Sequence, residues 1–234
     1  MGCNPEGFPW RGKIFSTVWK TAILGGMKIL ALECSTDAAS VALLEDGAVV
    51  AAAGLDASRR RSQGLFDAVA SLLSGAGWDL EGIGAYAVGR GPGAYTGLRV
   101  SLTAANGWAL PGGKPVWTVS SGAVRAAEVL AGKPGAAQVV AWGDARRGMI
   151  WAGLFERDGG GVRHVGEWLL MPAAEKPSIW HRAFWIDPGY VPQAGWVGRL
   201  FFAGGPSEER QPIYLNPAVG IAPRFDANGQ ALAP

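Results

Sequence analysis

The sequence predicts an α/β fold in which helices alternate with the strands of a mixed sheet. Two observations predict it. Three short apolar runs open the fold, and further apolar runs then alternate with stretches of helical periodicity, separated by glycine-rich turns. The resulting order up to about residue 132 is β-β-β-α-β-α-β-α, in which an antiparallel start is followed by strands suited to parallel pairing. A composition of 49% hydrophobic and 17% charged residues allows a buried core, and a net charge of +2 gives no argument for nucleic-acid binding.

The first three strands are marked by apolar runs and by one turn signal. Lys28–Cys34 is nearly continuously apolar, as a strand buried on both faces requires. Ser40–Leu44 and Ala48–Ala53 follow it, and Asp46-Gly47 between them is a strong hairpin signal. We therefore expect the second and third strands to form a hairpin.

Helical periodicity then alternates with two further strands. The spacing of apolar residues predicts a helix over Ser62–Ala76 with Ser62 as its N-cap, and another over Thr96–Ala109 capped by Thr96. A third helix is expected over Ser120–Leu130. The strands that separate these helices are predicted at Ile83–Val88 and Val116–Val119.

The second half of the chain is richer in strand signals and shorter in regular structure. Strands are predicted at Gln138–Trp142, Met149–Phe155 and Val162–Leu169, whereas no helix is predicted after Pro172, because Gly, Pro and Trp follow no period there. We expect residues 27–132 to form an N-terminal subdomain and residues 133–234 an abbreviated C-terminal one.

Residues 1–26 differ from the rest, and we expect them to be a dispensable extension, disordered or not native. The apolar stretch Lys13–Leu24 is too short to cross a bilayer, which needs about 20 apolar residues. Met27 directly precedes the first strand and is the expected functional start. Cys3 and Cys34 are the only cysteines, so no disulfide framework is possible, which fits a reducing compartment such as the cytoplasm.

The stretch 89–99 is the most informative part of the sequence, because it joins a strand to a helix N-terminus through four glycines. Glycine lets the backbone approach a ligand, and free helix amides favour an anion, although a tight structural turn explains the same glycines. The chain contains no Gly-Lys-Ser/Thr triplet, and no acidic residue lies between Gly89 and Ala127 to hold a ribose, so two phosphate-loop motifs are excluded. The candidate ligand-binding residues are Gly89, Arg90, Gly91, Pro92, Gly93, Tyr95, Thr96, Gly97 and Arg99.

Two carboxylates near strand ends are the other candidates for chemistry. Glu33 precedes the polar pair Ser35 and Thr36, which suits a nucleotide, and Asp144 precedes Arg146, a pairing that is commonly structural. We favour a structural role for both carboxylates.

No metal site and no catalytic residue is predicted. The two histidines, His164 and His181, have no helical metal-ligand spacing. The basic run Arg59–Arg61 is interpreted as a solvated face, with contact to an acidic partner or to RNA phosphate as the alternative.

In combination these segments resemble the TsaB/YeaZ family. The run Gly-Arg-Gly-Pro-Gly-Ala-Tyr-Thr-Gly-Leu-Arg at 89–99 is similar to the hallmark of that family, and Ile29–Thr36 is similar to its opening strand, with Glu33 where the family usually has Asp. Asp144-Ala145-Arg146 and the closing Pro212–Leu215 also match, so that the resemblance extends from Met27 to Ala218.

The resemblance implies an actin/sugar-kinase/Hsp70 ATPase-like fold with two related subdomains, the second of them shortened. It implies a pseudoenzyme that supports TsaD, the transferase that makes threonylcarbamoyladenosine next to the tRNA anticodon. A TsaE-like ATPase is the further partner that it implies, with a homodimer in isolation, indirect or auxiliary tRNA contact and no membrane. No cofactor is expected, and ATP or ADP is expected only in complex with partners.

We expect helices Ser62–Ala76 and Thr96–Ala109 to dock on the catalytic paralogue or on a second copy of this chain. Phe66 and Leu73 lie off the main apolar line of the first helix and are the predicted interface residues. The alternative function is a nucleotide-dependent transferase or kinase-like enzyme acting through Glu33 and the Gly89–Gly97 loop. A glycoprotease activity fits the residues least well.

Overall fold

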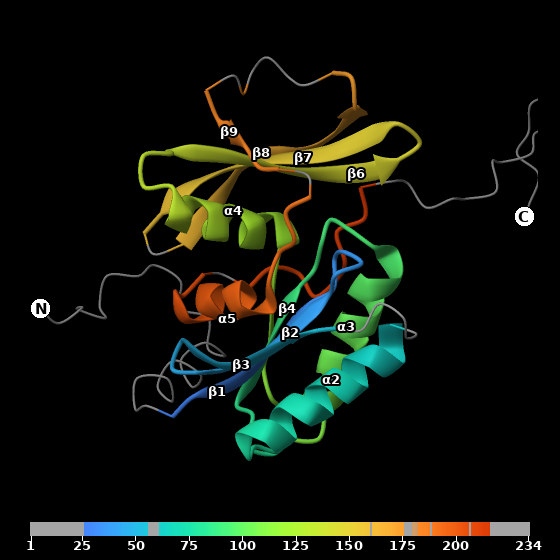
Figure 1. Ribbon diagram of the computed structural model, residues 1–234, viewed down its shortest axis with the longest axis vertical. Helices are drawn as coiled ribbons and strands as arrows, with labels where there is room; N and C mark the ends of the chain where they lie inside the picture. The colour runs from blue at the N-terminus through green and yellow to red at the C-terminus, as the bar shows by residue number, and fades with distance from the viewer. Residues whose placement is uncertain are drawn as a thin grey trace, which may run out of the picture.

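The computed structural model describes residues 26–55, 61–159, 161–175, 180, 182–187, 189–205 and 207–215. They form two β-sheets, with helices packed between the sheets and on the far face of the first one (Figure 1). The expected extension lies outside the described residues except for Gly26, and so does the basic run Arg59–Arg61 except for the backbone of Arg61.

The first sheet has the strand order β3-β2-β1-β4-β5. Strands β1, β2 and β3 pair antiparallel, whereas β4 pairs parallel to β1 and β5 pairs parallel to β4. The predicted antiparallel start and parallel continuation are therefore confirmed. The strands are β1 (Lys28–Glu33), β2 (Ser40–Glu45), β3 (Ala48–Gly54), β4 (Ala85–Gly89) and β5 (Val116–Val119).

Strand β1 is buried on both faces, as its continuous apolar run predicted. Ile29 and Ala31 belong to the core between the two sheets, whereas Leu30 and Leu32 belong to the core under the outer helices. The predicted hairpin between β2 and β3 is also confirmed, because Asp46 and Gly47 turn the chain with positive φ angles of 49° and 87°.

Helices α2 (Arg61–Ala76) and α3 (Tyr95–Ala109) cover the outer face of the first sheet (Figure 1). Both predicted N-caps are wrong. Helix α2 begins before Ser62, and α3 follows Ala94, whose methyl group accepts no hydrogen bond, so Thr96 lies inside the first turn. The first turn of α3 is fixed instead by the segment 89–94 that precedes it, which we call the glycine loop.

Helix α4 (Ser121–Gly132) lies against the second sheet, and Ser120 caps it by accepting a hydrogen bond of 3.2 Å from the amide of Ala123. The second sheet has the order β8-β7-β6-β9, with antiparallel β6–β7 and β7–β8 pairs and a parallel β6–β9 pair. These three pairings repeat those of β1 with β2, β2 with β3 and β1 with β4. The strands are β6 (Gln138–Arg146), β7 (Met149–Asp158), β8 (Gly161–Pro172) and β9 (Phe184–Trp185).

Helix α5 (Ala194–Phe202) lies between the sheets and packs on both the first sheet and α4 (Figure 1). The sequence reading predicted no helix after Pro172 and missed it. Two glycines lower the helix propensity of α5, and its nine residues are too few for a helical period to stand out among the irregular Gly, Pro and Trp positions around it.

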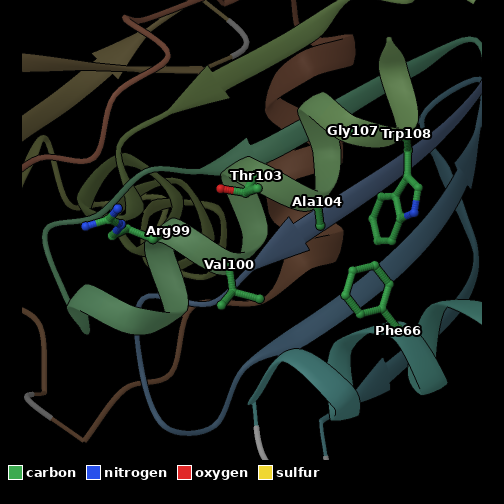
Figure 2. Close-up of a pocket in the computed structure, with 7 residues that line it drawn as sticks. All are labelled: Phe66, Arg99, Val100, Thr103, Ala104, Gly107 and Trp108. Carbon is green, nitrogen blue, oxygen red and sulfur yellow. The ribbon is translucent and has the colours of Figure 1, made fainter. Parts of the chain in front are cut away.

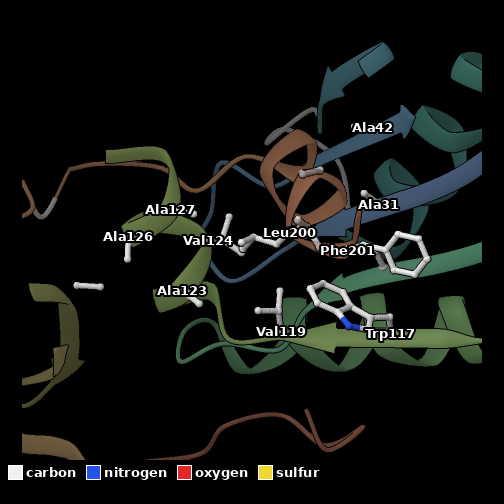
Figure 3. Close-up of a cluster of buried hydrophobic side chains, with 14 of the residues drawn as sticks. Ala31, Ala42, Trp117, Val119, Ala123, Val124, Ala126, Ala127, Leu200 and Phe201 are labelled. Atoms are coloured by element: carbon white, nitrogen blue, oxygen red, sulfur yellow. The ribbon is translucent and has the colours of Figure 1, made fainter. Parts of the chain in front are cut away.

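The core between the sheets joins segments from both halves of the chain. Trp117 and Val119 of β5, Val124 of α4, and Leu200 and Phe201 of α5 meet in it (Figure 3). The ring of Trp117 packs edge to face on Phe201, with centroids 5.9 Å apart. The first sheet therefore packs on α5, which comes from the second half of the chain, and the second sheet packs on α4, which ends at the expected boundary. That boundary, near residue 132, stays a prediction.

None of the helices in the described ranges is both long enough and apolar enough to cross a membrane.

The contact of α5 with β2 leaves no space for a methyl group at Gly198. A Cβ there would lie 2.4 Å from Cδ1 of Leu44, a side chain that is completely buried. Gly198→Ala is expected to lower the free energy of unfolding by about 1–2 kcal/mol, since overpacking outweighs the gain in helix propensity. Urea unfolding measures the change, with Gly75→Ala in α2 as the control, because nothing lies within 4 Å of a Cβ at that position. Equal stability of the two variants would contradict this account of the core.

Candidate functional site

The glycine loop between β4 and α3 is held by backbone hydrogen bonds from two neighbouring segments. The amide of Ala94 donates to the carbonyl of Ser35 at 2.7 Å, which ties the loop to the end of β1. The amide of Ser121 donates to the carbonyl of Gly91 at 2.7 Å, and the Ser121 hydroxyl accepts from the Gly91 amide at 3.0 Å. The loop is therefore a junction between β1, β4 and the start of α4.

The glycines of this loop are required by close packing. A Cβ on Gly89 would lie 2.0 Å from Oε2 of Glu33, and a Cβ on Gly93 would lie 2.2 Å from the carbonyl oxygen of Ser35. Gly91 has a φ angle of +95°, and a Cβ there would lie 2.7 Å from Leu98. The structural interpretation of these glycines thus accounts for them without a ligand.

The candidate residues of the stretch 89–99 divide by exposure. Gly89, Gly91, Pro92 and Gly97 are buried, and Arg90 is half-buried. The remaining candidates are accessible to a ligand or a partner, and they are Gly93, Tyr95, Thr96 and Arg99.

Glu33 lies at the centre of the junction with only 1% of its surface exposed. Its Oε1 accepts hydrogen bonds from the amide of Ser35 at 2.8 Å and from the hydroxyl of Ser121 at 3.1 Å. Its Oε2 is buried with no hydrogen-bond partner among the described residues and faces the backbone of Gly89. Burial raises the pKa of this carboxyl, and the hydrogen bonds from Ser35 and Ser121 only partly oppose that shift.

Arg125 is a buried cation whose charge interacts with that of Glu33. It is 4% exposed and donates from Nε to the carbonyl of Tyr190 at 3.0 Å and from its terminal nitrogens to the carbonyls of Trp142 and Tyr190. Burial lowers the pKa of this guanidinium, and the charge of Glu33 opposes the shift. Arg125 thus fastens α4 to the second sheet and to the segment before α5.

Arg90 fastens the C-terminal segment to the loop. Its Nε lies 3.3 Å from Oε2 of Glu208, its Nη1 donates to the carbonyl of Glu209 at 2.6 Å, and its carbonyl accepts from the amide of Ile213 at 2.9 Å. Burial raises the pKa of Glu208, although the Ser120 amide and Arg90 oppose the shift. The closing motif Pro212–Leu215 therefore lies beside the glycine loop, and Arg90 is engaged with it.

A groove of about 380 Å³ separates α2 from α3 (Figure 2). The rings of Phe66 on α2 and Trp108 on α3 meet across it edge to face, with centroids 5.4 Å apart and an angle of 86° between their planes. Phe66 is 48% exposed. The groove is lined by Phe66, Arg99, Val100, Thr103, Ala104, Gly107 and Trp108.

The structure separates the two residues predicted for the docking face. Phe66 is exposed in the groove, whereas Leu73 is only 7% exposed and packs in the core beneath α2, so its assignment to an interface was wrong. The sequence reading also missed Val100, Ala104 and Trp108. Their spacing of i, i+4 and i+8 forms a second apolar stripe beside the one that packs on the sheet, and that stripe is the signal that was overlooked.

Comparisons with known proteins agree on one family. A family model described as TsaD, tRNA N6-adenosine threonylcarbamoyltransferase, matches residues 55–180, more than half of the chain. The tRNA threonylcarbamoyladenosine biosynthesis protein TsaB of Escherichia coli is 36% identical over 176 residues, which are 73% of this chain and 72% of that protein. The chain belongs to the TsaB/YeaZ family.

Two solved structures support the assignment to the TsaB/YeaZ family. YeaZ from Pseudomonas aeruginosa is 30% identical with a TM-score of 0.68, and the match covers 81% of this chain and all of that one. A second Pseudomonas aeruginosa structure, described as similar to peptidase YeaZ, is 29% identical with a TM-score of 0.69 over the same 81% of this chain. The mixed α/β fold with two sheets is thus the fold of this family.

The TsaB-type Asp-Ala-Arg motif has a local role in this chain. Asp144 accepts a hydrogen bond of 2.9 Å from the amide of Arg146, where the chain turns from β6 to β7 with a φ angle of 67° at Arg146. Both residues lie on the second sheet, whereas Glu33 and the glycine loop lie on the first. In the described parts of the chain, no group of three or more His, Cys, Asp or Glu side chains is placed to hold a metal ion.

The raised pKa of Glu33 predicts a pH dependence of stability. Because the folded protein holds this proton more tightly than the unfolded chain, the stabilisation is complete below the unfolded pKa and is lost as the pH rises through the folded one. Glu33→Gln cannot titrate. We expect the stability of the wild type relative to Glu33→Gln to fall as the pH rises above about 4, the ordinary pKa of a glutamate.

Urea unfolding at a series of pH values measures this difference. The control is Glu81→Gln, which alters an exposed carboxylate and is expected to follow the wild-type profile. A constant difference between the wild type and Glu33→Gln across the pH range would show that Glu33 does not titrate in this way.

Proposed function

We propose that the protein is a non-catalytic subunit that supports a TsaD-like transferase in the synthesis of N6-threonylcarbamoyladenosine next to the tRNA anticodon. The observation that carries the proposal is the apolar groove between α2 and α3. The name of the Escherichia coli relative places that protein in threonylcarbamoyladenosine biosynthesis, and the match of this chain to the TsaD family model supports a paralogue as the partner.

The groove has the composition of a protein–protein contact. Phe66 and Trp108 provide two large aromatic side chains, Val100 and Ala104 form an apolar floor, and Arg99 stands at the rim. Interfaces place aromatic anchors at the centre and polar or charged groups around them. Two helices with such a groove suit the equivalent helix pair of a paralogue, and the same face suits a homodimer when the protein is isolated.

The geometry around Glu33 supports a scaffold over the kinase-like alternative. A carboxylate that acts on a phosphate has to reach it, but Glu33 is buried and its Oε2 faces the Gly89 backbone. The loop enters α3 at Ala94, and the amide of Ala94 already donates to the carbonyl of Ser35, so this amide is not free to bind a phosphate. The junction is filled by protein groups, so we propose no cofactor of its own, and ATP or ADP only in complex with partners.

The remaining parts of the proposal follow from the family and the fold. The repeated strand pairings of the two sheets support two related subdomains of the actin/sugar-kinase/Hsp70 ATPase-like type, with 27–132 and 133–234 as their approximate extents. The second described sheet has four strands where the first has five, which supports a shortened second subdomain. A TsaE-like ATPase is proposed as the further partner. The protein is proposed to act in the cytoplasm, where tRNA is modified.

A reconstituted modification assay tests the function directly. It combines tRNA, labelled threonine, the adenylate-forming enzyme and the TsaD-like and TsaE-like proteins, with or without this protein. We expect label in tRNA only when this protein and the TsaD-like protein are both present. Label that appears without the TsaD-like protein would make this chain the enzyme and would overturn the proposal.

Phe66→Glu is expected to weaken association with the TsaD-like partner at least 30-fold, because it places an unpaired charge in the apolar groove. The free energy of unfolding is expected to fall by about 1–2 kcal/mol, since the edge-to-face contact with Trp108 is lost, and the half-exposed position is expected to leave the protein folded. Calorimetric titration measures the binding and urea unfolding the stability.

Two further glutamate variants of α2 serve as controls, one at the exposed surface and one in the core. Ser71→Glu adds the same charge at an exposed position about 140° around α2, and it is expected to leave association unchanged. Leu73→Glu is expected to unfold the protein, because it buries a charge in the core. Normal binding by folded Phe66→Glu protein would remove the groove as the docking site.

A further inference from the structure

Two exposed tyrosines meet at the surface beside the groove. Tyr95 is 55% exposed and Tyr214 is 49% exposed, and their ring centroids lie 5.1 Å apart with 32° between the planes. The guanidinium of Arg99 lies over the Tyr95 ring, 5.2 Å from its centroid, and donates a hydrogen bond to the Tyr95 hydroxyl. We call Tyr95, Tyr214 and Arg99 the tyrosine platform.

The fold holds this platform in place from beneath. Tyr95 is the first residue of α3 and follows the glycine loop, which is tied to β1 through Ala94 and Ser35. Tyr214 follows Ile213, whose amide donates to the carbonyl of Arg90 in the same loop. Both rings are therefore positioned by backbone hydrogen bonds of neighbouring residues, while large parts of their surfaces stay in solvent.

Core packing does not account for this aromatic pair, because about half of each tyrosine stays exposed to solvent. The chemistry of the platform fits a flat, polar, aromatic ligand. Two tilted rings offer a stacking surface, their hydroxyl groups offer hydrogen bonds at the edge, and the guanidinium supplies a positive charge for a neighbouring phosphate. A nucleotide carries all three complements, since its base supplies the aromatic face and the polar edge and its phosphate supplies the negative charge, whereas an aliphatic peptide side chain carries none of the polar ones.

We propose that the tyrosine platform is a stacking site for an unpaired base of an RNA strand. The inference rests on the proposed function, in which the partner modifies a tRNA. Arg99 belongs to both the platform and the rim of the docking groove, so a base held on the platform would lie beside the docked partner. An auxiliary RNA contact is thereby located at residues 95, 99 and 214.

The test measures RNA binding by the full chain alone, using fluorescence anisotropy with a labelled RNA hairpin that has an unpaired loop. Competitors are a fully paired RNA duplex of the same length and free adenosine monophosphate. We expect the hairpin to bind more tightly than either competitor. Tyr95→Ala and Tyr214→Ala are each expected to weaken hairpin binding about 5- to 100-fold, which is the loss typical of one aromatic stacking contact.

Conservative variants separate stacking from folding. Tyr95→Phe and Tyr214→Phe retain the rings and are expected to bind the hairpin within about threefold of the wild type, since stacking needs only the π face. Unchanged hairpin binding by both alanine variants would overturn the proposal, and so would equal binding of the duplex. Binding of adenosine monophosphate as tight as that of the hairpin would make the ligand a free nucleotide and would also overturn it.

The same variants distinguish this inference from the docking proposal. Phe66→Glu is expected to lose the TsaD-like partner and keep the hairpin, whereas Tyr214→Ala is expected to lose the hairpin and keep the partner. If Tyr214→Ala loses the partner and keeps the hairpin, the rings belong to the protein interface, and the RNA site is wrong. Failure of Phe66→Glu to affect the partner would contradict the docking proposal alone.

Discussion

At the end of β1 the carboxylate of Glu33 lies directly against the backbone of Gly89, and this contact sets the geometry around it. It brings β1 and β4 together where both strands end, and the Ser121 hydroxyl adds the start of α4 through a hydrogen bond of 3.1 Å. The glycine loop then passes close to the carbonyl of Ser35, and position 93 has no space there for a residue larger than glycine. The direction in which α3 leaves the loop, and with it the outer groove, follows from this packing.

The same junction explains why a segment near the end of the described chain returns to the first sheet. Arg90 projects from the loop to Glu208 and Glu209, and Thr118 of β5 donates to the carbonyl of Glu208 at 2.6 Å. Helix α5 meanwhile fills the space between the sheets, so residues that follow the second sheet complete the core of the first. The first sheet depends on the second half of the chain for its inner face and for one side of its glycine loop.

Sequence reasoning recovered those parts of the fold that local chemistry specifies. The apolar run of β1, the Asp46-Gly47 turn and the periodicity of α2 and α3 each depend on residues close together in the chain. The reading failed at α5, whose two glycines and length of only nine residues obscure its helical period. It failed again for Leu73, because Leu73 follows Leu65 and Val69 at a spacing of four residues and packs in the same core beneath α2.

The candidate site shows the same division. The stretch 89–99 was identifiable from its glycines, but whether those glycines serve a ligand or a neighbouring side chain depends on Glu33, which lies 56 positions earlier than Gly89. The pairing of Tyr95 with Tyr214 spans 119 positions and carries no local signal at all. The same stretch packs its inner side against Glu33 and exposes Tyr95 and Arg99 on its outer side. Because buried groups occupy the interior of the loop, its outer residues are rigidly placed, and rigid placement is what a surface needs in order to position a partner without doing chemistry itself.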